Sequence, residues 1–403
     1  MKAGWHTKTL GDVLVKTETV NPAQLPENEF DYIDVSSVSN ETFEIVETQR
    51  LKGQDAPSRA RKLVKANDVI FATIRPTLKR IAIVPENLDN QVCSTGYFVL
   101  RPKPGIDHRF VFYSLFTASF QESMEALQKG ASYPAVTDGD VRAQQIPLPP
   151  LTEQRRIVSI LGEAFDGIVT AKANAEKNLR NAHAIFESCL RSVFSRGENG
   201  WRRETHLSSV LSEQPRNGWS PPLEFQTGAG VPVLTLSSVT GFEYDGARVK
   251  MSSVPTRSEA HYWLKSDELL ITRSNTPELV GHVAIYDGNP VKAICCDLIM
   301  KMTVNPSKAL TRFIYYYLRS PEARAHIMSR AHGASSTMKK IGKQVVQGIP
   351  VPLPPLSEQQ SVVLMLDAYQ QEAKRLESIY QRKLAALDEL KQSLLHQAFS
   401  SAL

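Results

Sequence analysis

The sequence PLPPLTEQ at residues 147–154 occurs a second time, with one conservative change, as PLPPLSEQ at residues 352–359. The two copies lie 205 residues apart, and this offset continues without a gap to Phe-Ser at 194–195 and at 399–400. Because proline cannot continue a helix or a central strand, each copy predicts an extended segment from which a helix then starts. The segments that follow the two Pro-Pro pairs therefore decide the fold.

Weaker similarities keep the same order along the rest of the chain. IDVSSV at 33–38 returns as LTLSSV at 234–239, and RFVFY at 109–113 returns as RFIYY at 312–316. The tripeptide GAS occurs in both halves as well, and the offsets grow along the chain without ever reversing. A chance similarity would not keep this order. The chain is therefore predicted to be a tandem duplication in which each half is a globular part followed by a helix.

The two tails are expected to be long amphipathic helices. Thr152 and Ser357 are predicted N-caps, each followed by a glutamate that favours the helix dipole. Apolar residues then recur at steps of three and four, a pattern typical of a seam against another helix, and only Lys391 breaks it. The residues predicted to pack the two helices together are Ile157, Leu161, Ile168, Leu179 and Phe186 in the first, and Val362, Leu366, Leu376, Leu384, Leu387 and Leu394 in the second.

The length of the tails indicates that the helices pair with each other. From Thr152 to Arg196 the first tail has about 45 residues, or roughly 68 Å of helix, which needs a partner to be stable. The first helix leads from one globular part to the next and the second must return, so an antiparallel, coiled-coil-like pair with pseudo-twofold symmetry is expected. The alternative, two unrelated amphipathic helices on separate cores, stays open.

Each globular part combines strand-like and helix-like segments. Apolar runs at 69–74 and 81–84 are typical of strands, whereas 110–128 and 312–329 are typical of helices. An α/β or mixed α+β fold of about 150 residues is therefore predicted for each part. The expected domains are 1–148 for the first globular part, 149–198 for the first long helix, 199–353 for the second globular part and 354–403 for the second long helix.

Composition excludes several classes of protein. The 403 residues carry a net charge of +5, and 42% of them are hydrophobic, which is ordinary globular usage and not that of a disordered chain. The four cysteines show no CxxC spacing, so neither a disulfide framework nor a metal site is predicted. No stretch approaches the ~18 apolar residues of a membrane span. A soluble, cytoplasmic protein is expected.

Basic residues cluster in both globular parts. Nine Lys or Arg residues face two acidic ones between 50 and 80, and nine face one between 301 and 350. Such clusters neutralise phosphates, and Arg can also contact a guanine edge with two hydrogen bonds. The GAS motifs could offer backbone N–H groups to a phosphate, or simply end a helix. The residues predicted to contact DNA are Arg50, Lys52, Arg59, Arg61, Lys62, Arg75, Lys79, Arg80 and Ser132 in the first half, and Arg273, Arg330, Ser335, Lys339, Lys340 and Lys343 in the second.

No catalytic motif is found in the sequence. Asn305-Pro306 is followed by Ser-Lys and not by the Pro-aromatic pair of a base-flipping methyltransferase, and Val233 stands where the third glycine of GxGxxG would fall after Gly228. GxxxxGK[ST] and HExxH are both absent. Asp138-Gly139-Asp140 is interpreted as a turn or cap. No residue of this chain is therefore predicted to be catalytic.

Two variable globular parts, each ending in (I/V)PLPPL(T/S)EQ and a long helix that closes on Phe-Ser, resemble the DNA-specificity (S) subunits of type I restriction-modification systems. The resemblance covers essentially the whole chain. It implies that each globular part is a target-recognition domain for one half of a split, asymmetric DNA site. It also implies that the two helices are the spacer that fixes the half-site separation.

The same resemblance implies partners and cofactors. Two methyltransferase (M) subunits would dock on this chain and methylate adenine N6 with S-adenosylmethionine. Two restriction/translocase (R) subunits would use ATP and Mg²⁺. This chain itself would bind double-stranded DNA and no cofactor.

Two other functions stay open at this stage. One is a bivalent scaffold or adaptor whose globular parts bind proteins, with the basic clusters incidental. The other is a specificity part of a different DNA-modification assembly. Strong, salt-sensitive DNA binding would exclude the first, and a methyltransferase and a helicase-nuclease encoded beside this chain would distinguish the second. The repeats diverge most between 39–95 and 240–300, which favours globular parts that bind two different targets.

Overall fold

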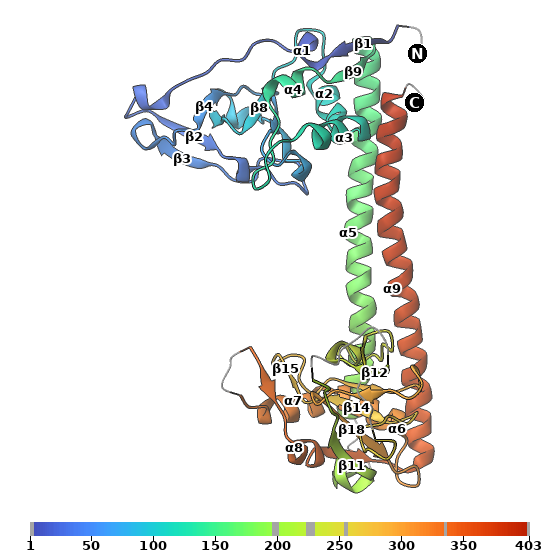
Figure 1. Ribbon diagram of the computed structural model, residues 1–403. Helices are drawn as coiled ribbons and strands as arrows, with labels where there is room; N and C mark the ends of the chain where they lie inside the picture. Colours follow the sequence, from blue (N-terminus) through green and yellow to red (C-terminus); the bar gives the residue numbers. More distant parts are fainter. Residues whose placement is uncertain (1–3, 196–200, 223–229, 254–256, 334–336, 401–403) are drawn as a thin grey trace. The chain divides into compact units, whose positions relative to one another are not determined.

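The computed structural model describes residues 4–195, 201–222, 230–253, 257–333 and 337–400, without the side chains of 202–204. The chain folds into two compact units (Figure 1). Unit 1 comprises Met1–Glu176 with Arg382–Leu403, and unit 2 comprises Lys177–Gln381. Within the described residues, no helix is both long and apolar enough to cross a membrane.

Unit 1 contains three small sheets. A four-stranded sheet has the order β3-β2-β7-β4, a three-stranded sheet has the order β6-β5-β8, and β1 pairs with β9. Among the strand pairs described in unit 1, only β2–β7 is parallel. The strands are β1 His6–Thr9, β2 Glu29–Ile33, β3 Gln49–Lys52, β4 Ala60–Leu63, β5 Val69–Ala72, β6 Ile81–Ile83, β7 Val92–Ser94, β8 Tyr97–Leu100 and β9 Gln145–Leu148, and the α-helices of this part are α1 Leu10–Val13, α2 His108–Ser114, α3 Ala118–Leu127 and α4 Asp138–Arg142.

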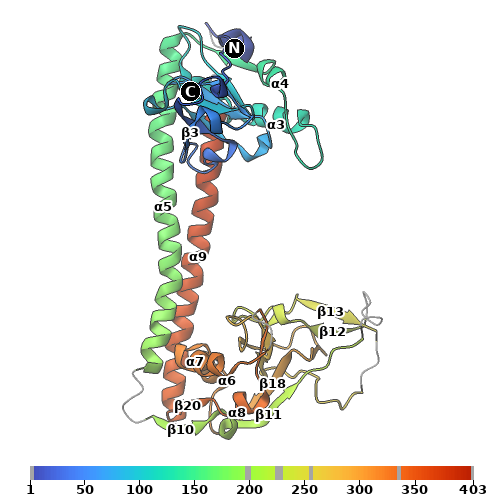
Figure 2. The same ribbon diagram turned by 90° about the vertical axis from the view of Figure 1, so that its left-hand side faces the viewer.

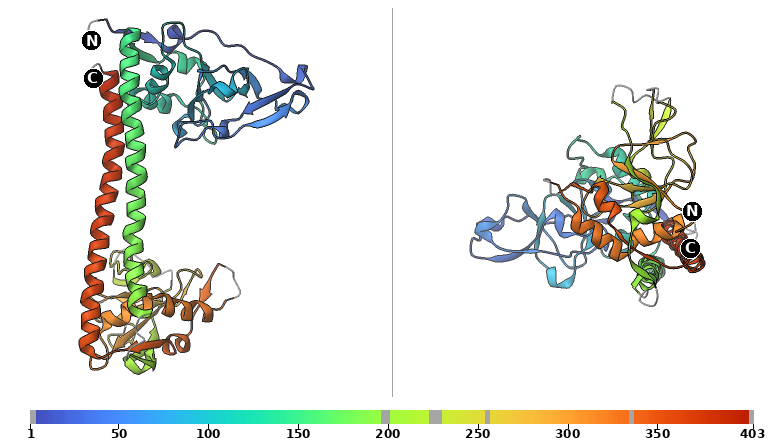
Figure 3. Two further views of the ribbon diagram at one scale, coloured as in Figure 1. Left: turned by 180° about the vertical axis from the view of Figure 1, so that it is seen from behind. Right: turned by 90° about the horizontal axis from the view of Figure 1, so that it is seen from below.

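Strand β5 lies at the centre of unit 1 because both of its faces are apolar. Val69 and Phe71 point to a cluster formed with α2, α3 and the long helices, whereas Ile70 and Ala72 point to a second cluster on the other face. Side chains alternate between the faces of a strand, so a continuous apolar run fits a strand that is covered on both sides. In Figures 1 and 3, α2 and α3 lie beside α5, and β2 and β3 lie at the far side of the unit.

Unit 2 has a similar arrangement of sheets, but here the sheet that contains the strand equivalent to β5, β14, has four strands and the other large sheet has three. A four-stranded sheet has the order β11-β18-β14-β16, a three-stranded sheet has the order β13-β12-β17, and β10–β20 and β15–β19 form two-stranded sheets. Figure 2 shows β10 and β20 near α9, and β12 and β13 far from it. The strands are β10 Arg202–His206, β11 Leu211–Asn217, β12 Val231–Leu234, β13 Val249–Ser252, β14 Leu269–Thr272, β15 Ser274–Asn275, β16 Val283–Ile285, β17 Ile294–Cys295, β18 Ile299–Val304, β19 Lys339–Lys340 and β20 Pro350–Leu353, and the shorter α-helices are α6 Thr311–Arg319, α7 Pro321–Arg330 and α8 Lys343–Gln347.

The two tails form α5, Leu151–Ser195, and α9, Leu356–Phe399. The prediction that Thr152 and Ser357 are N-caps is wrong, because each helix begins one residue earlier, directly after the Pro-Pro pair. The carbonyl oxygen of Pro150 accepts hydrogen bonds from the backbone N–H groups of Glu153 and Gln154 at 2.9 and 3.0 Å. Threonine and serine at these positions are therefore already helical.

The antiparallel pairing of the two helices is confirmed within each unit. In unit 1, Leu161 near the start of α5 shares a buried cluster with Leu395 near the end of α9. In unit 2, Leu190 near the end of α5 shares one with Leu366 near the start of α9. Of the predicted seam residues, Ile157, Leu161, Ile168, Phe186, Val362 and Leu366 are buried, and Leu179, Leu376, Leu384, Leu387 and Leu394 are partly buried.

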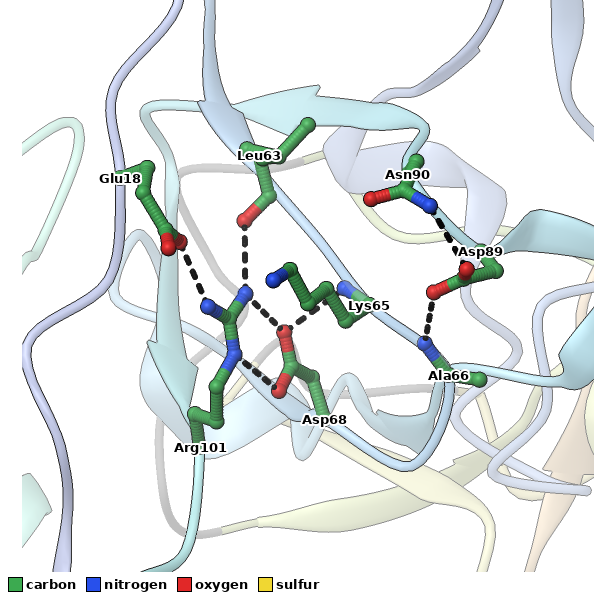
Figure 4. A network of polar contacts seen from close by, with 8 residues as sticks. All are labelled: Glu18, Leu63, Lys65, Ala66, Asp68, Asp89, Asn90 and Arg101. Carbon is green, nitrogen blue, oxygen red and sulfur yellow. Dashed lines mark hydrogen bonds and ion pairs between the residues drawn. The ribbon is translucent and has the colours of Figure 1, made fainter.

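A buried ion pair stands at the same place in both units. Asp68, directly before β5, accepts two hydrogen bonds from Arg101 at 2.9 and 2.8 Å and one from the backbone of Lys65 (Figure 4). In unit 2, Glu268 lies directly before β14 and pairs with Lys301 at 2.6 Å. Each pair ties the start of the central strand to its antiparallel neighbour. Arg101 and Lys301 therefore each neutralise a buried carboxylate of their own unit.

Candidate nucleic-acid interface

A cleft of about 640 Å³ in unit 1 brings together three of the arginines predicted to contact DNA. It lies where the chain leaves β5 and meets the hairpin loop between Lys129 and Ala135, whose ends pair with each other. The side chains that line it are Asp34, Val35, Ser36, Arg59, Ile74, Arg75, Leu78, Arg80, Tyr133 and Ala135. Tyr133 is 71% exposed. An open cleft with guanidinium groups and an exposed ring suits contact with a polyanion that also presents flat bases.

Arg75 is held in place at the edge of this cleft. Its backbone has a left-handed conformation, with φ of 51°, and its N–H donates to the carbonyl oxygen of Pro134 at 2.7 Å. Its guanidinium lies over the ring of Tyr133, 5.3 Å from the ring centre. This cation–π contact restricts the conformations of the Arg75 side chain.

The two other arginines of the cleft differ in their contacts. The Arg80 guanidinium donates to the carbonyl oxygens of Val35 and Val38 at 2.9 and 3.1 Å. Arg59 is exposed, and within the described part of the chain we find no hydrogen bond or ion pair of its side chain. Arg80 thus supports the wall of the cleft, whereas Arg59 is available to a ligand.

The corresponding place in unit 2 is built differently. The chain leaving β14 forms β15, which pairs with β19 so that Ser274 faces Lys340 and Asn275 faces Lys339. The backbone N–H of Ile341 also donates a hydrogen bond to the carbonyl oxygen of Arg273. By these pairings Asn275 occupies the position equivalent to Arg75. The cationic groups at this place come from β19, as Lys339 and Lys340. Lys340 and Lys343 are exposed, and Arg273 and Lys339 are partly buried.

A family model described as "Type I restriction modification DNA specificity domain" matches residues 2–179 and 218–381, which is most of the chain. This chain belongs to that family. Among curated relatives, the Type I restriction enzyme EcoKI specificity subunit of Escherichia coli K12 is 26% identical over 329 residues, and the StySPI specificity subunit of Salmonella potsdam is 24% identical over 328. In both comparisons the alignment covers 77% of this chain and 69% of the relative.

Solved structures agree with this assignment. A chain in a structure of the type I R-M system, which describes complex assembly and conformational transition, is 30% identical with a TM-score of 0.84, covering 99% of this chain and 98% of that one. The HsdS subunit from Thermoanaerobacter tengcongensis is 29% identical with a TM-score of 0.69, covering 100% and 98%. The predicted family and mixed α/β fold are thereby confirmed, and the family's role is sequence-specific recognition of DNA.

Several residues predicted to contact DNA in this specificity-domain chain instead engage neighbouring side chains. Arg50 on β3 pairs with Glu29 and Asp31 on β2 at 3.3 and 2.9 Å, and Lys52 pairs with Glu27 at 3.1 Å. These cross-strand pairs neutralise the two cations. They are exposed, so a phosphate could compete for them at a cost.

The contacts of Lys62 lie inside unit 1. Its ammonium donates to Asp138 at 2.8 Å and to the carbonyl oxygen of Tyr97 at 2.6 Å, and its side chain is 16% exposed. Arg61 donates to the carbonyl oxygen of Ala60 at 2.8 Å. Lys79 is partly buried, with a left-handed φ of 52° next to the cleft wall. Sequence counting could not separate Lys62 from the free cations, because its partner Asp138 is 76 residues away in the chain.

The same counting overstates the charge of the second cluster. Lys301 is buried against Glu268, Arg312 pairs with Asp367, and Arg324 donates to the carbonyl oxygen of Val280. Arg330 is exposed at the end of α7 and donates to Ser329 at 3.2 Å. At the β15–β19 ribbon, Lys339 donates to the carbonyl oxygen of Gly333 at 3.2 Å, whereas Lys340 and the nearby Lys343 are exposed.

The first GAS motif, Gly130-Ala131-Ser132, occupies a hairpin loop and not a helix end. Gly130 has φ of 102°, and a Cβ there would meet the carbonyl oxygen of Tyr133 at 3.0 Å, so glycine is required. Ser132 lies in this exposed loop beside Tyr133. In unit 2, Gly333 follows His332, which pairs with Lys340, and Ser335 lies outside the described residues. The helix-stop alternative is therefore wrong for Gly130, since α3 ends three residues earlier.

Sequence reasoning missed two features of the site. Tyr133 carries no pattern that distinguishes it from any loop residue. The second is the burial of the glutamine in the repeated EQ, since Gln154 and Gln359 are 1% and 0% exposed. Among the described residues, no group of three or more His, Cys, Asp or Glu is arranged to hold a metal ion.

Proposed function

We propose that this chain is the DNA-recognition subunit of a type I restriction-modification complex, with unit 1 contacting one half of a split, asymmetric site and unit 2 the other. The observation that carries the proposal is the pair of equivalent positions beside the two hairpin loops. Unit 1 has Arg75 and Tyr133 there, with Arg75 bonded to Pro134. In unit 2, Asn275 faces Lys339, and Met338 directly precedes Lys339 as Tyr133 directly precedes Pro134. Similar frameworks with different side chains are expected to bind different base sequences.

The partners follow from this role. Methyltransferase subunits would carry S-adenosylmethionine and flip and methylate the target adenine, and restriction subunits would use ATP and Mg²⁺. This chain would supply no catalytic group. Two subunits of each kind is the stoichiometry that we propose, in a cytoplasmic complex that binds double-stranded DNA.

The direct test is to map N6-methyladenine across a host genome that expresses this chain with the methyltransferase encoded beside it. We expect a motif with two defined halves, separated by undefined bases and methylated once on each strand. Cells that express the methyltransferase alone provide the control. An active, assembled complex that methylates no defined motif would favour the alternative of a protein-binding scaffold.

A second measurement separates DNA recognition from incidental charge. The logarithm of the DNA association constant of the assembled complex should fall linearly with the logarithm of salt concentration. A matched duplex should compete roughly a thousandfold or more better than an unrelated one. Equal competition by both duplexes would contradict specific recognition.

The spacer role of the helices stays a prediction. Lengthening α5 and α9 together by about four residues, one helical turn, should change the number of undefined bases that the complex tolerates. Both half-sites should keep their sequences. A change in the recognised bases themselves would contradict this role.

A further inference from the structure

We propose that Arg75 recognises a guanine in the half-site bound by unit 1, and that Tyr133 holds its guanidinium in the orientation that this contact needs. The inference rests on the proposed function and goes beyond it by naming the base and the residue. It draws on the cleft at the end of β5, where the conformation of Arg75 is determined by the backbone and by a ring.

The backbone directs the Arg75 side chain along one line. Its left-handed φ of 51°, its hydrogen bond to Pro134 and the ring of Pro76 on its C-terminal side leave the Cα–Cβ bond little freedom. The ring of Tyr133 then lies under the guanidinium, 5.3 Å away. An arginine that is already ordered loses less entropy when it binds, so more of its contact energy appears as base discrimination.

The contacts of the three arginines assign their roles. The Nη1 of Arg80 donates to the carbonyl oxygens of Val35 and Val38, so this side chain is part of the cleft wall. Arg59 is exposed and has no aromatic support in the described residues, which suits a phosphate, since a phosphate accepts from many directions. Among the described residues, Arg75 is the one of the three whose guanidinium lies over an aromatic ring, and its side chain makes no hydrogen bond there. A planar fork of donors matches the O6 and N7 acceptors of guanine.

A carboxylate in the same cleft is consistent with a G·C pair. Asp34 lines the cleft and accepts hydrogen bonds from the hydroxyls of Tyr32 and Ser36 at 3.1 and 3.4 Å. A carboxylate repels phosphate but accepts from the N4 amino group of cytosine. A fork of donors and a carboxylate in the same cleft match the two adjacent acceptors of guanine and the amino donor of cytosine.

Unit 2 provides an internal contrast. Asn275 stands at the position of Arg75, and its side-chain amide accepts from the N–H of Thr276 at 2.9 Å and donates to the Thr240 hydroxyl at 3.4 Å. It offers no guanidinium fork. A guanine contact of this kind is accordingly expected in one half-site only.

The experiment compares variants of the full chain in the assembled methyltransferase complex by methylation mapping. In Arg75→Ala and Arg75→Lys, we expect one G·C position of one half-site to relax, with roughly ten- to hundredfold loss of discrimination there, and the other half-site to stay unchanged. Tyr133→Ala should relax the same position less strongly. Lys65→Ala, an exposed cation of the same unit outside the cleft, is the matched control and should leave the motif intact.

A base analogue tests the contact atom by atom. Once the motif is known, 7-deazaguanine at the relaxed position removes N7 but keeps Watson–Crick pairing. We expect it to weaken binding of the wild-type complex several-fold and to leave binding of the Arg75→Ala complex unchanged. Arg59→Ala should instead weaken all duplexes alike and reduce the salt slope by about one.

The outcomes separate this inference from the proposed function. A split motif in which Arg75→Ala changes no position, or changes an A·T position, would overturn the guanine contact and leave the proposed function standing. No defined motif from the wild-type complex would overturn both. Equal sensitivity of wild type and Arg75→Ala to 7-deazaguanine would show that another residue makes the N7 contact.

Discussion

The ammonium of Lys391 on α9 lies 4.8 Å from the centre of the Phe43 ring. It also lies 5.2 Å from the ring of Phe165 on α5. Phe43 and its repeat counterpart Phe242 both have left-handed φ values, 59° and 64°. In unit 2, however, the position of Lys391 is held by Phe186. The cation there is Arg319 from α6, which lies over both Phe186 and Phe242.

Each unit therefore joins its globular part to the long helices by contacts between cations and aromatic rings, and the cations come from different elements. In unit 2, Arg324 of α7 also lies over Phe242, 5.6 Å from the ring centre. The arrangement explains why Lys391 interrupts the apolar seam of α9. Its burial among rings lowers its pKa. A double-mutant cycle with Lys391→Met and Phe43→Leu should give a coupling free energy of roughly 0.5–2 kcal/mol in thermal or denaturant unfolding.

The control cycle uses Lys383→Met, an exposed lysine of the same helix, with Phe43→Leu. It should show no coupling within error. Coupling of the same size in both cycles would mean that the effect comes from helix propensity or net charge and not from the ring contact.

The buried glutamines are predicted to hold the helix starts in place. The Gln154 carbonyl accepts from the N–H of Asp107 and its amide donates to the carbonyl of Pro149, both at 2.9 Å. Gln359 makes the equivalent bonds to Leu310 and Pro354. Gln154→Leu or Gln359→Leu should lower the free energy of unfolding by about 2–4 kcal/mol, because two buried backbone groups lose their partners.

The matched control is Gln360→Leu, since Gln360 follows Gln359 and is exposed. Its effect should stay within about 0.5 kcal/mol in the same denaturation experiment. Comparable destabilisation by Gln360→Leu would argue against the role of the buried amides.

The ion pair of Glu268 and Lys301 is predicted to be costly to break on one side. Their side chains are 1% and 4% exposed, so Lys301→Met leaves a buried carboxylate without its cation. We expect a loss of about 3–5 kcal/mol, and a partial recovery in the double variant Lys301→Met/Glu268→Gln. Hydrogen exchange of the β14 and β18 amides in the full chain locates the effect in unit 2.

The exposed pair of Lys265 and Glu213, at 3.1 Å, is the comparison. Lys265→Met should cost no more than about 1 kcal/mol. If both lysine variants had the same small effect, the carboxylate of Glu268 would have to be reached by water or protonated.

Unit 2 is predicted to lose stability in mild acid because of His282. Burial, followed by the positive charge of Arg324, lowers the pKa of His282 from 6.5 to about 4. Its Nδ1 accepts from the N–H of Gly241 at 3.0 Å, which requires the neutral ring. The stabilisation is complete above pH 6.5 and is lost as the pH falls toward 4. In this range His282 is protonated in the unfolded chain but stays neutral in the folded chain.

Thermal unfolding from pH 7 to pH 4 should therefore show a steeper decline for the wild type than for His282→Asn, which keeps an acceptor and does not titrate. His261→Asn, at an exposed histidine, should follow the wild type. Identical pH slopes for His282→Asn and the wild type would contradict this assignment.

The parts of the molecule that repeat were predictable, and the parts that depend on pairing were not. The steps of three and four after Gln154 and Gln359 indicate a buried stripe, because that spacing puts side chains on one face of a helix. Arg75 and Arg80 were found as members of a basic cluster. Lys62 and Lys301 belonged to the same counts, and only their distances to Asp138 and Glu268 reveal that they are internal.

From the sequence alone follow the duplication, the two long helices and the basic character of both globular parts, since each of these is a periodic or compositional property. The folded chain decides what each helix packs against. Every compact unit combines the start of one long helix with the end of the other. The end of each long helix also packs on a helix of the globular part, Phe399 of α9 against Phe110 of α2 and Phe194 of α5 against Phe313 of α6. The folded chain also decides which cations are free. An apolar stripe or a charged residue in the sequence indicates that a packing or pairing partner is needed. Which residue becomes that partner depends on contacts between residues far apart in the chain.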